Sequence, residues 1–280
     1  MNLFRRIRRR LLDPVATRIV AGQDRYWYED PLGSAPRAEA ATYRALWEEA
    51  KGRNFPDIDA FEAERGHALD KDWLDALALK TQIVIKDSRL NYQHGRVLYA
   101  TLRRFLEDRP DLRDVTILET GTARGFSALC MARALRDVGA AGRVLTMDVL
   151  PHDTPMYWNC IADAEGRKSR RELLEDYTDL LDGVLFLQGD TRRQIARLGL
   201  GRVPFAYLDA QHTFNDVMAE AGIILPRQQA GDIIVFDDVT ETVFPGVCRA
   251  VEKIETEHGY RAERLQSGPE RGYAILTKSR

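Results

Sequence analysis

Two short apolar runs in the last third of the chain end in aspartate, and a helical pattern separates them. The runs are residues 205–209 (FAYLD) and 232–238 (DIIVFDD), and apolar residues recur at helical spacing over 214–225. Runs that are apolar on both faces are typical of inner strands of a parallel sheet covered by helices. The segment therefore predicts a β-α-β unit. Because its crossover is right-handed in nearly all proteins, both strands should end at the same edge of one sheet.

The same rhythm of strand, turn and helix begins near residue 114 and continues to the end of the chain. The further strands are predicted over 115–119, 143–148, 184–190, 260–266 and 272–277. The further helices are predicted over 126–139, 167–181 and 246–258. The short joint between the last two strands predicts a hairpin, so the last strand should be antiparallel to its neighbour. The pattern predicts an α/β fold with a doubly wound, mostly parallel, Rossmann-like sheet of seven strands.

The first part of the chain has a different pattern. Residues 38–108 carry mostly helical stripes, which predict a cover that packs on the sheet. We place the domain boundary so that 1–110 form the N-terminal segment and cover, and 111–280 form the sheet domain. Residues 1–20 are rich in arginine and amphipathic. They are interpreted as a solvated terminus, with a helix that binds a surface or a partner as the alternative.

Charge and cysteine content limit the possible functions. The 41 basic and 43 acidic residues leave a net charge of −2, which argues against a general nucleic-acid binder. The three cysteines are widely spaced and form no CxxC pair, so they indicate reduced thiols of a cytoplasmic protein. No apolar run approaches the roughly 18 residues that a membrane span needs.

A glycine-containing turn follows the first strand of the sheet domain. Residues 119–125 read ETGTARG, and glycines at this place let the backbone approach a ligand while the following helix offers unpaired N–H groups. The turn matches neither a dinucleotide fingerprint nor a phosphate loop. A turn needed only for tight packing is the alternative to a ligand site.

Acidic residues end the next two strands. Asp148 lies roughly 20 residues past the glycines, where a carboxylate can accept both hydroxyls of a ribose. Asp190 repeats that position on the third strand and could accept from an adenine amino group. Either aspartate alone could be a turn or cap residue. Together they predict a nucleoside site without a phosphate grip.

Three carboxylates converge at the ends of the last two parallel strands. Asp209, Asp237 and Asp238 would repel one another without a cation, and an all-oxygen set suits Mg²⁺, Mn²⁺ or Ca²⁺. The alternative is that Asp237 and Asp238 cap a turn while Asp209 pairs with an arginine. His212 lies three residues beyond Asp209, close enough to face the same pocket.

These segments resemble the class I S-adenosylmethionine-dependent methyltransferases. More narrowly, they resemble the metal-dependent sugar O-methyltransferases of the macrocin and aminocoumarin type. The segments are ETGTARG (119–125), MDV (147–149), GDT (189–191), LDAQH (208–212) and VFDDV (235–239). The first three are general to the class, and the last two are specific. Catechol-type relatives have lysine at the His212 position and usually Asp-Asn after the fifth strand, so histidine and Asp-Asp favour the sugar branch.

The resemblance implies roles for particular residues. Those implied to bind the cofactor are Glu119, Gly121, Thr122, Gly125, Asp148 and Asp190. Asp148 would hold the ribose and Asp190 the adenine side, while the turn holds the methionine end. Those implied to bind Mg²⁺ or Mn²⁺ are Asp209, Asp237 and Asp238. His212 occupies the position of the base, and Asp209 is the other candidate for that role.

The sequence therefore predicts an S-adenosylmethionine-dependent O-methyltransferase that acts on a sugar hydroxyl. Its partner would be a small hydroxylated acceptor rather than nucleic acid, no membrane span is expected, and a homo-oligomer is possible. Tyr157 and Trp158, in a loop after the second strand, could stack on the sugar or the adenine. The alternatives are a hydroxylase-like or catechol-type relative on the same fold, and a cofactor-binding interaction protein without catalysis.

Overall fold

The computed structural model describes residues 30–268 and 271–279. The predicted basic segment over 1–20 lies outside these residues. A seven-stranded sheet runs through the molecule in the order β3-β2-β1-β4-β5-β7-β6. Its strands are β1 (Val115–Thr120), β2 (Gly142–Asp148), β3 (Val184–Gln188), β4 (Phe205–Leu208), β5 (Ile233–Phe236), β6 (Tyr260–Gln266) and β7 (Gly272–Lys278).

The strand directions confirm the predicted fold class. Neighbouring strands from β3 to β5 are parallel, and β7 is antiparallel to both β5 and β6. The order reverses direction at β1, so the carboxyl ends of β1 and β4 flank the point where open α/β sheets bind ligands.

Alternate residues of each strand enter two separate cores. In β4, Phe205 and Tyr207 pack on the side of α7 (His94–Glu107) and α8 (Phe126–Val138). Ala206 and Leu208 face α12 (Phe214–Ile224) and α13 (Pro245–Glu257). This alternation explains why the strand is apolar at every position: both faces of the sheet are covered by helices.

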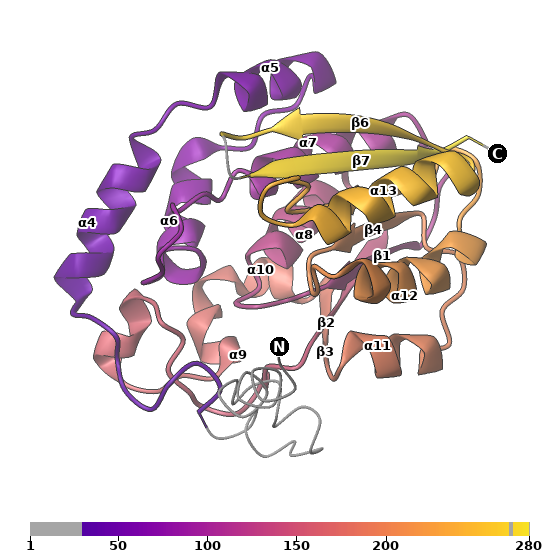
Figure 1. The fold of residues 1–280 in the computed structure, drawn as a ribbon. Coiled ribbons are helices and arrows are strands. Elements are labelled where there is room, and N and C mark those ends of the chain that lie inside the picture. The colour runs from indigo at the N-terminus through magenta and orange to yellow at the C-terminus, as the bar shows by residue number, and fades with distance from the viewer. Residues whose placement is uncertain (1–29, 269–270, 280) are drawn as a thin grey trace, which may run out of the picture.

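The helical cover packs along one side of the sheet (Figure 1). It consists of α4 (Ala40–Lys51), α5 (Pro56–Arg65) and α6 (Lys71–Thr81). Pro56 begins α5, where its missing N–H costs nothing, and the Asp70 carboxylate caps α6 by accepting from Trp73 N at 2.8 Å. Buried residues of these helices, such as Leu77, join the core that α7 and α8 form with the sheet.

The polar helix predicted over 167–181 is wrong. That segment forms α9 (Arg170–Leu173), a 3₁₀ turn η2 (Glu175–Tyr177) and α10 (Thr178–Leu181). Leu173 packs with Trp158 in a small satellite core, whereas Leu174 enters the main core. Since one straight helix cannot serve both cores, the chain turns between them. The remaining short elements are η1 (Ile161–Glu165), α11 (Thr191–Gln194), η3 (Ile195–Arg197) and η4 (Leu225–Arg227).

Cys130, Cys160 and Cys248 are free, and the first two are buried. Among the described residues, no helix is both long and apolar enough to cross a membrane.

Candidate active site

The carboxyl ends of β4 and β5 bring the specific motifs together. Leu208 pairs with Phe236 in the parallel register, so Asp209 and Asp237 leave the sheet side by side. Asp209 N donates to Thr120 O at 3.0 Å, which ties the end of β4 to the end of β1. The predicted convergence of these strand ends is therefore present.

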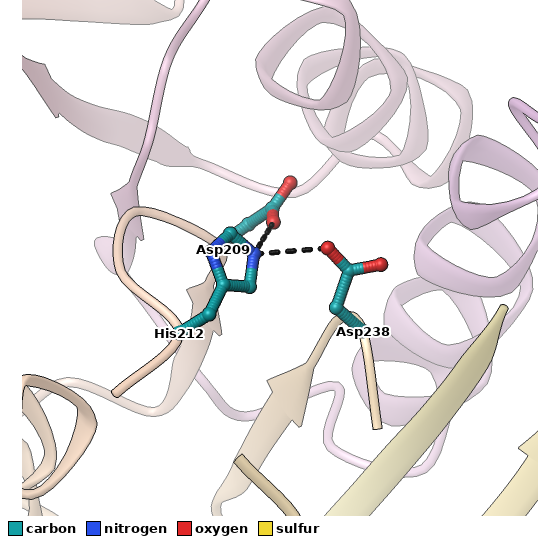
Figure 2. Close-up of side chains that lie close together, drawn as sticks. All are labelled: Asp209, His212 and Asp238. Carbon is teal, nitrogen blue, oxygen red and sulfur yellow. Dashed lines mark ion pairs between the residues drawn. The ribbon is translucent and has the colours of Figure 1, made fainter. Parts of the chain in front are cut away.

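His212 lies between two of the predicted carboxylates (Figure 2). Its Nε2 is 2.9 Å from Asp238 Oδ2 and 3.7 Å from Asp209 Oδ1, and these donor atoms all lie within 4.8 Å of one another. His212 Nε2 is buried and makes no hydrogen bond of suitable geometry, so its contacts with Asp209 and Asp238 are ion pairs. Burial lowers the pKa of His212, but the two carboxylates outweigh it and raise the pKa to about 10.

Local packing fixes the imidazole. Thr213 caps α12 by accepting from Asp216 N at 3.2 Å, which ends the loop that carries His212. The Phe244 ring stacks on the imidazole with centroids 4.4 Å apart. A Cβ on Gly246 would lie 2.6 Å from His212 O, so only glycine lets α13 approach this loop so closely.

Asp237 lies outside this group and has other partners. Tyr207 donates its hydroxyl to Asp237 Oδ2 at 2.6 Å, and the Arg271 guanidinium forms an ion pair with the same carboxylate. Burial opposes the charge of Asp237, but Arg271 outweighs it and lowers the pKa. Asp209 behaves differently, since burial and the nearby Asp237 raise its pKa to about 7.

The predicted set of three aspartates does not fit a divalent ion in this structure. Asp237 already binds the Arg271 guanidinium, and Asp238 Oδ1 lies 3.1 Å from Arg271 Nη1. The argument for a metal was that like charges need a cation, and two side chains supply positive charge here. His212 forms ion pairs with Asp209 and Asp238, and Arg271 forms ion pairs with Asp237 and Asp238.

Sequence reasoning missed Arg271. It stands in the stretch PERGY of the final hairpin, where nothing distinguishes it from a surface arginine. The available signal was the antiparallel pairing of the last strand, which returns the chain to the end of β5.

The first predicted cofactor residue is sealed inside the protein. Glu119 is fully buried and accepts hydrogen bonds from the Ser127 and Thr146 hydroxyls. Burial raises its pKa to about 7. Thr122 Oγ1 lies 2.5 Å from Thr146 Oγ1 and extends the same chain of hydrogen bonds. Glu119 is therefore placed to brace the turn from behind, rather than to contact a cofactor directly.

The turn itself is held by Asp148. Its Oδ2 accepts from Ala123 N at 2.7 Å, and its Oδ1 accepts from Leu150 N at 2.8 Å. Behind the turn, the buried Arg170 donates from Nε to Ala123 O at 2.9 Å. Gly125 adopts a φ of 91° at the start of α8, which favours glycine. Asp148 remains half-buried with lone pairs to spare, as a ribose ligand would need.

Asp190 and Trp158, which were expected to contact a ligand, have structural roles. Asp190 caps α11 and pairs with Arg192 at 2.8 Å, so its contact with adenine stays a prediction. The expectation that Trp158 stacks on a ligand is wrong. The Trp158 side chain is completely buried, and its indole donates to Lys168 O at 2.7 Å. Its apolar surface serves the satellite core instead.

A large cavity of about 1390 Å³ adjoins the strand ends. It is lined by the helical cover, by the loop before α7, and by Asp238, Phe244 and Arg271. Asp238 and Phe244, which line the cavity, both contact His212, so the imidazole lies directly behind this part of the wall. Lys86 also lines it, and burial together with Arg271 lowers the pKa of this amine. A cavity of this size can take a small organic molecule.

We expect Gly121→Ala to disrupt the site. Gly121 has a φ of 90°, and a Cβ there would lie 2.3 Å from Asp209 O. Gly139→Ala is the matched control, because Gly139 has a φ of 69° but no atom within 4 Å of its Cβ position. The control should lose only the left-handed strain of about 1 to 2 kcal/mol. Denaturant unfolding should show a clearly larger loss for Gly121→Ala, and equal losses would contradict the close approach.

Comparison with known proteins agrees with this architecture. Residues 118–239 match the family described as a methyltransferase domain. A rhamnosyl O-methyltransferase of Mycobacterium bovis is 30% identical over 162 residues, which cover 52% of this chain and 58% of the relative. Proteins of the same name from Mycobacterium tuberculosis match equally. The chain thus spans somewhat over half the length of these curated relatives.

Two solved structures share the fold at low sequence identity. Cofactor-bound Rv0187 from MTB is 21% identical with a TM-score of 0.55, over 80% of this chain and 97% of that one. The O-methyltransferase TomG from Streptomyces achromogenes, in complex with SAM, is 17% identical with a TM-score of 0.52, over 76% and 92%. Residues 118–239 therefore match the methyltransferase-domain family, and the chain shares the Rossmann-like fold of these two structures.

Proposed function

We propose that the protein transfers a methyl group from S-adenosylmethionine to a hydroxyl of a sugar or glycosylated small molecule. The observation that carries this proposal is His212, held between Asp209 and Asp238 beside a cavity of about 1390 Å³. The match to a methyltransferase domain supports the cofactor. The relative named rhamnosyl O-methyltransferase supports a sugar acceptor.

The reaction needs a base because an alkyl hydroxyl is a poor nucleophile at neutral pH. Neutral His212 would take the hydroxyl proton as the oxygen attacks the methyl carbon, in line with the departing sulfur. The resulting imidazolium stays between Asp209 and Asp238, whose charges stabilise it. Because the pKa of His212 is about 10, the neutral fraction that can accept this proton grows as the pH rises toward that value.

The cofactor would lie along the ends of β1 and β2. Asp148 would face the nucleoside, and Gly121 lets the chain pass close to Asp209, so cofactor and acceptor sites would meet where β1 neighbours β4. Incubation with methyl-labelled cofactor and rhamnosyl or other sugar acceptors tests the function. Transfer of label supports it. Cofactor binding without label transfer to any hydroxyl would favour an interaction protein or a hydroxylase-like relative instead.

We expect Asp148→Ala to bind S-adenosylhomocysteine at least about tenfold more weakly than the native protein, the loss for about 1.4 kcal/mol of hydrogen bonding to ribose. Asp153→Ala is the control. Asp153 lies in the loop that follows Asp148, and its exposed carboxylate pairs with Arg171. Calorimetric titration measures both. If Asp148→Ala binds S-adenosylhomocysteine with the native affinity, Asp148 is not a ribose ligand.

A metal-dependent form of the reaction is the second candidate. The resemblance names Mg²⁺ or Mn²⁺, and the donor atoms of Asp209, His212 and Asp238 lie within 4.8 Å of one another. In that form, exhaustive chelation should abolish turnover and Mg²⁺ or Mn²⁺ should restore it. Full activity after chelation would mean that no metal ion is needed, and that side chains of the protein neutralise the aspartates.

A further inference from the structure

Arg271 contributes a positive charge to the ends of β4 and β5. It lies directly before β7, its guanidinium contacts Asp237, and its Nη1 lies 3.1 Å from Asp238 Oδ1. Only 18% of its side chain is exposed. A guanidinium keeps its charge at any physiological pH and presents five N–H donors in a fixed plane. Asp237 and Asp238 therefore share a permanent cationic partner.

The backbone around Arg271 is held tightly in place. Val239 N donates to Gly272 O at 2.9 Å, and a Cβ on Gly272 would lie 2.4 Å from Val239 O. Across the hairpin, Ser267 N donates to Arg271 O at 2.8 Å. Asn91, from the loop before α7, donates to Ser267 O at 2.8 Å. The guanidinium is thus positioned by β7, by the hairpin and by the helical side of the cavity.

We propose that Arg271 is the resident cation of this site, so that Asp237 and Asp238 are held in place without a divalent metal. The proposal deepens the proposed function, on which its role beside the acceptor rests. Arg271 is a positioning residue: it fixes Asp238, and Asp238 in turn holds His212 at 2.9 Å. Arg271 and Asp238 both line the cavity, so this pair forms the wall next to the imidazole.

A divalent ion would compete with Arg271 for the same oxygens. It would have to displace a guanidinium that is mostly buried, or sit beside its positive charge, and both weaken ion binding. Without the guanidinium, Asp237 and Asp238 lose their permanent cationic partner, and their carboxylate oxygens are ligands of the kind that suits Mn²⁺ or Mg²⁺. Removing Arg271 should therefore create a metal site that the native protein lacks.

The test is a Mn²⁺ titration of the metal-stripped full-length protein, in which electron paramagnetic resonance measures free Mn²⁺. Native protein should bind Mn²⁺ no more tightly than about 1 mM, and Arg271→Gln at least about tenfold more tightly. Arg264→Gln should behave as native, because Arg264 is an exposed arginine of the same hairpin that pairs with Glu255. Arg271→Lys keeps a charge and should gain less affinity than Arg271→Gln.

A second substitution assigns the new site. Adding Asp238→Asn to Arg271→Gln should remove the gained affinity. The proposal is overturned if the native protein binds Mn²⁺ with micromolar affinity and Asp237→Asn abolishes that binding. This measurement can be made even if Arg271→Gln fails to fold. Because the titration needs neither acceptor nor turnover, its result is independent of whether the protein transfers methyl groups.

Discussion

Replacing His212 by alanine is expected to lower kcat for methyl transfer by roughly 10² to 10⁴, the range for loss of a general base. Cofactor affinity should not change, because His212 follows β4 and contacts Asp238, whereas Asp148, the proposed ribose ligand, lies at the end of β2. Initial rates with saturating cofactor measure the first effect, and calorimetry with S-adenosylhomocysteine measures the second.

The matched control is His258→Ala, since His258 is an exposed histidine at the end of α13. It should leave both quantities unchanged. Asp209→Asn distinguishes the two candidate bases. Asp209 stands 3.7 Å from His212 Nε2, so its loss should weaken the base without removing it. If His212→Ala keeps most of its turnover while Asp209→Asn is inactive, Asp209 is the base.

The meeting of Asp209, His212 and Asp238 could be predicted because each step is local. Asp209 directly follows β4 and Asp238 is the second residue after β5, both strands are apolar on both faces, and the helix between them makes them parallel neighbours. His212 needs only three residues of loop to return to Asp209. Short sequence separations and the right-handed crossover leave few possible positions for these three side chains. Their proximity can therefore be predicted from the sequence pattern.

Arg271 could not be assigned in this way because its place depends on a register. Phe236 pairs with Ala274 in the antiparallel ladder, so continuing that pairing puts residue 271 opposite residue 239, next to the aspartates. A shift of one residue would point Arg271 to the other face of the sheet. The sequence predicts the hairpin, but the register comes from packing across the whole sheet. The metal expectation failed to account for this arginine.

Trp158 illustrates a second limit. A tryptophan in a loop after a strand end can face a ligand or anchor the loop, and the residue type is the same in both cases. Here the anchoring role prevails because Trp158 packs with Met156 of the same loop and with Leu173 of α9. The same satellite core breaks the helix predicted over 167–181. Neither outcome follows from periodicity, since it depends on contacts between separate segments.

The pH dependence of the reaction should follow His212. A general base works only when neutral, and a histidine is protonated below its pKa, so activity rises as pH rises toward that pKa. Asp209 and Asp238 raise the pKa of His212 to about 10. From about pH 7.5 to about pH 9.5, kcat/KM should therefore increase about tenfold per pH unit and level off above that range. An unperturbed histidine would instead give a plateau above about pH 7.5.

Removing one carboxylate should move this limb in a known direction. Asp238→Asn takes away the negative charge 2.9 Å from His212 Nε2, so the imidazolium loses stabilisation and its pKa falls. The acid limb should then shift by at least about one pH unit toward lower pH, even though the maximal rate is also reduced because the ring is less firmly held. Asp153→Asn is the control, as Asp153 is an exposed carboxylate that pairs with Arg171. A limb that stays at the same pH in Asp238→Asn would mean that a group other than His212 limits the reaction.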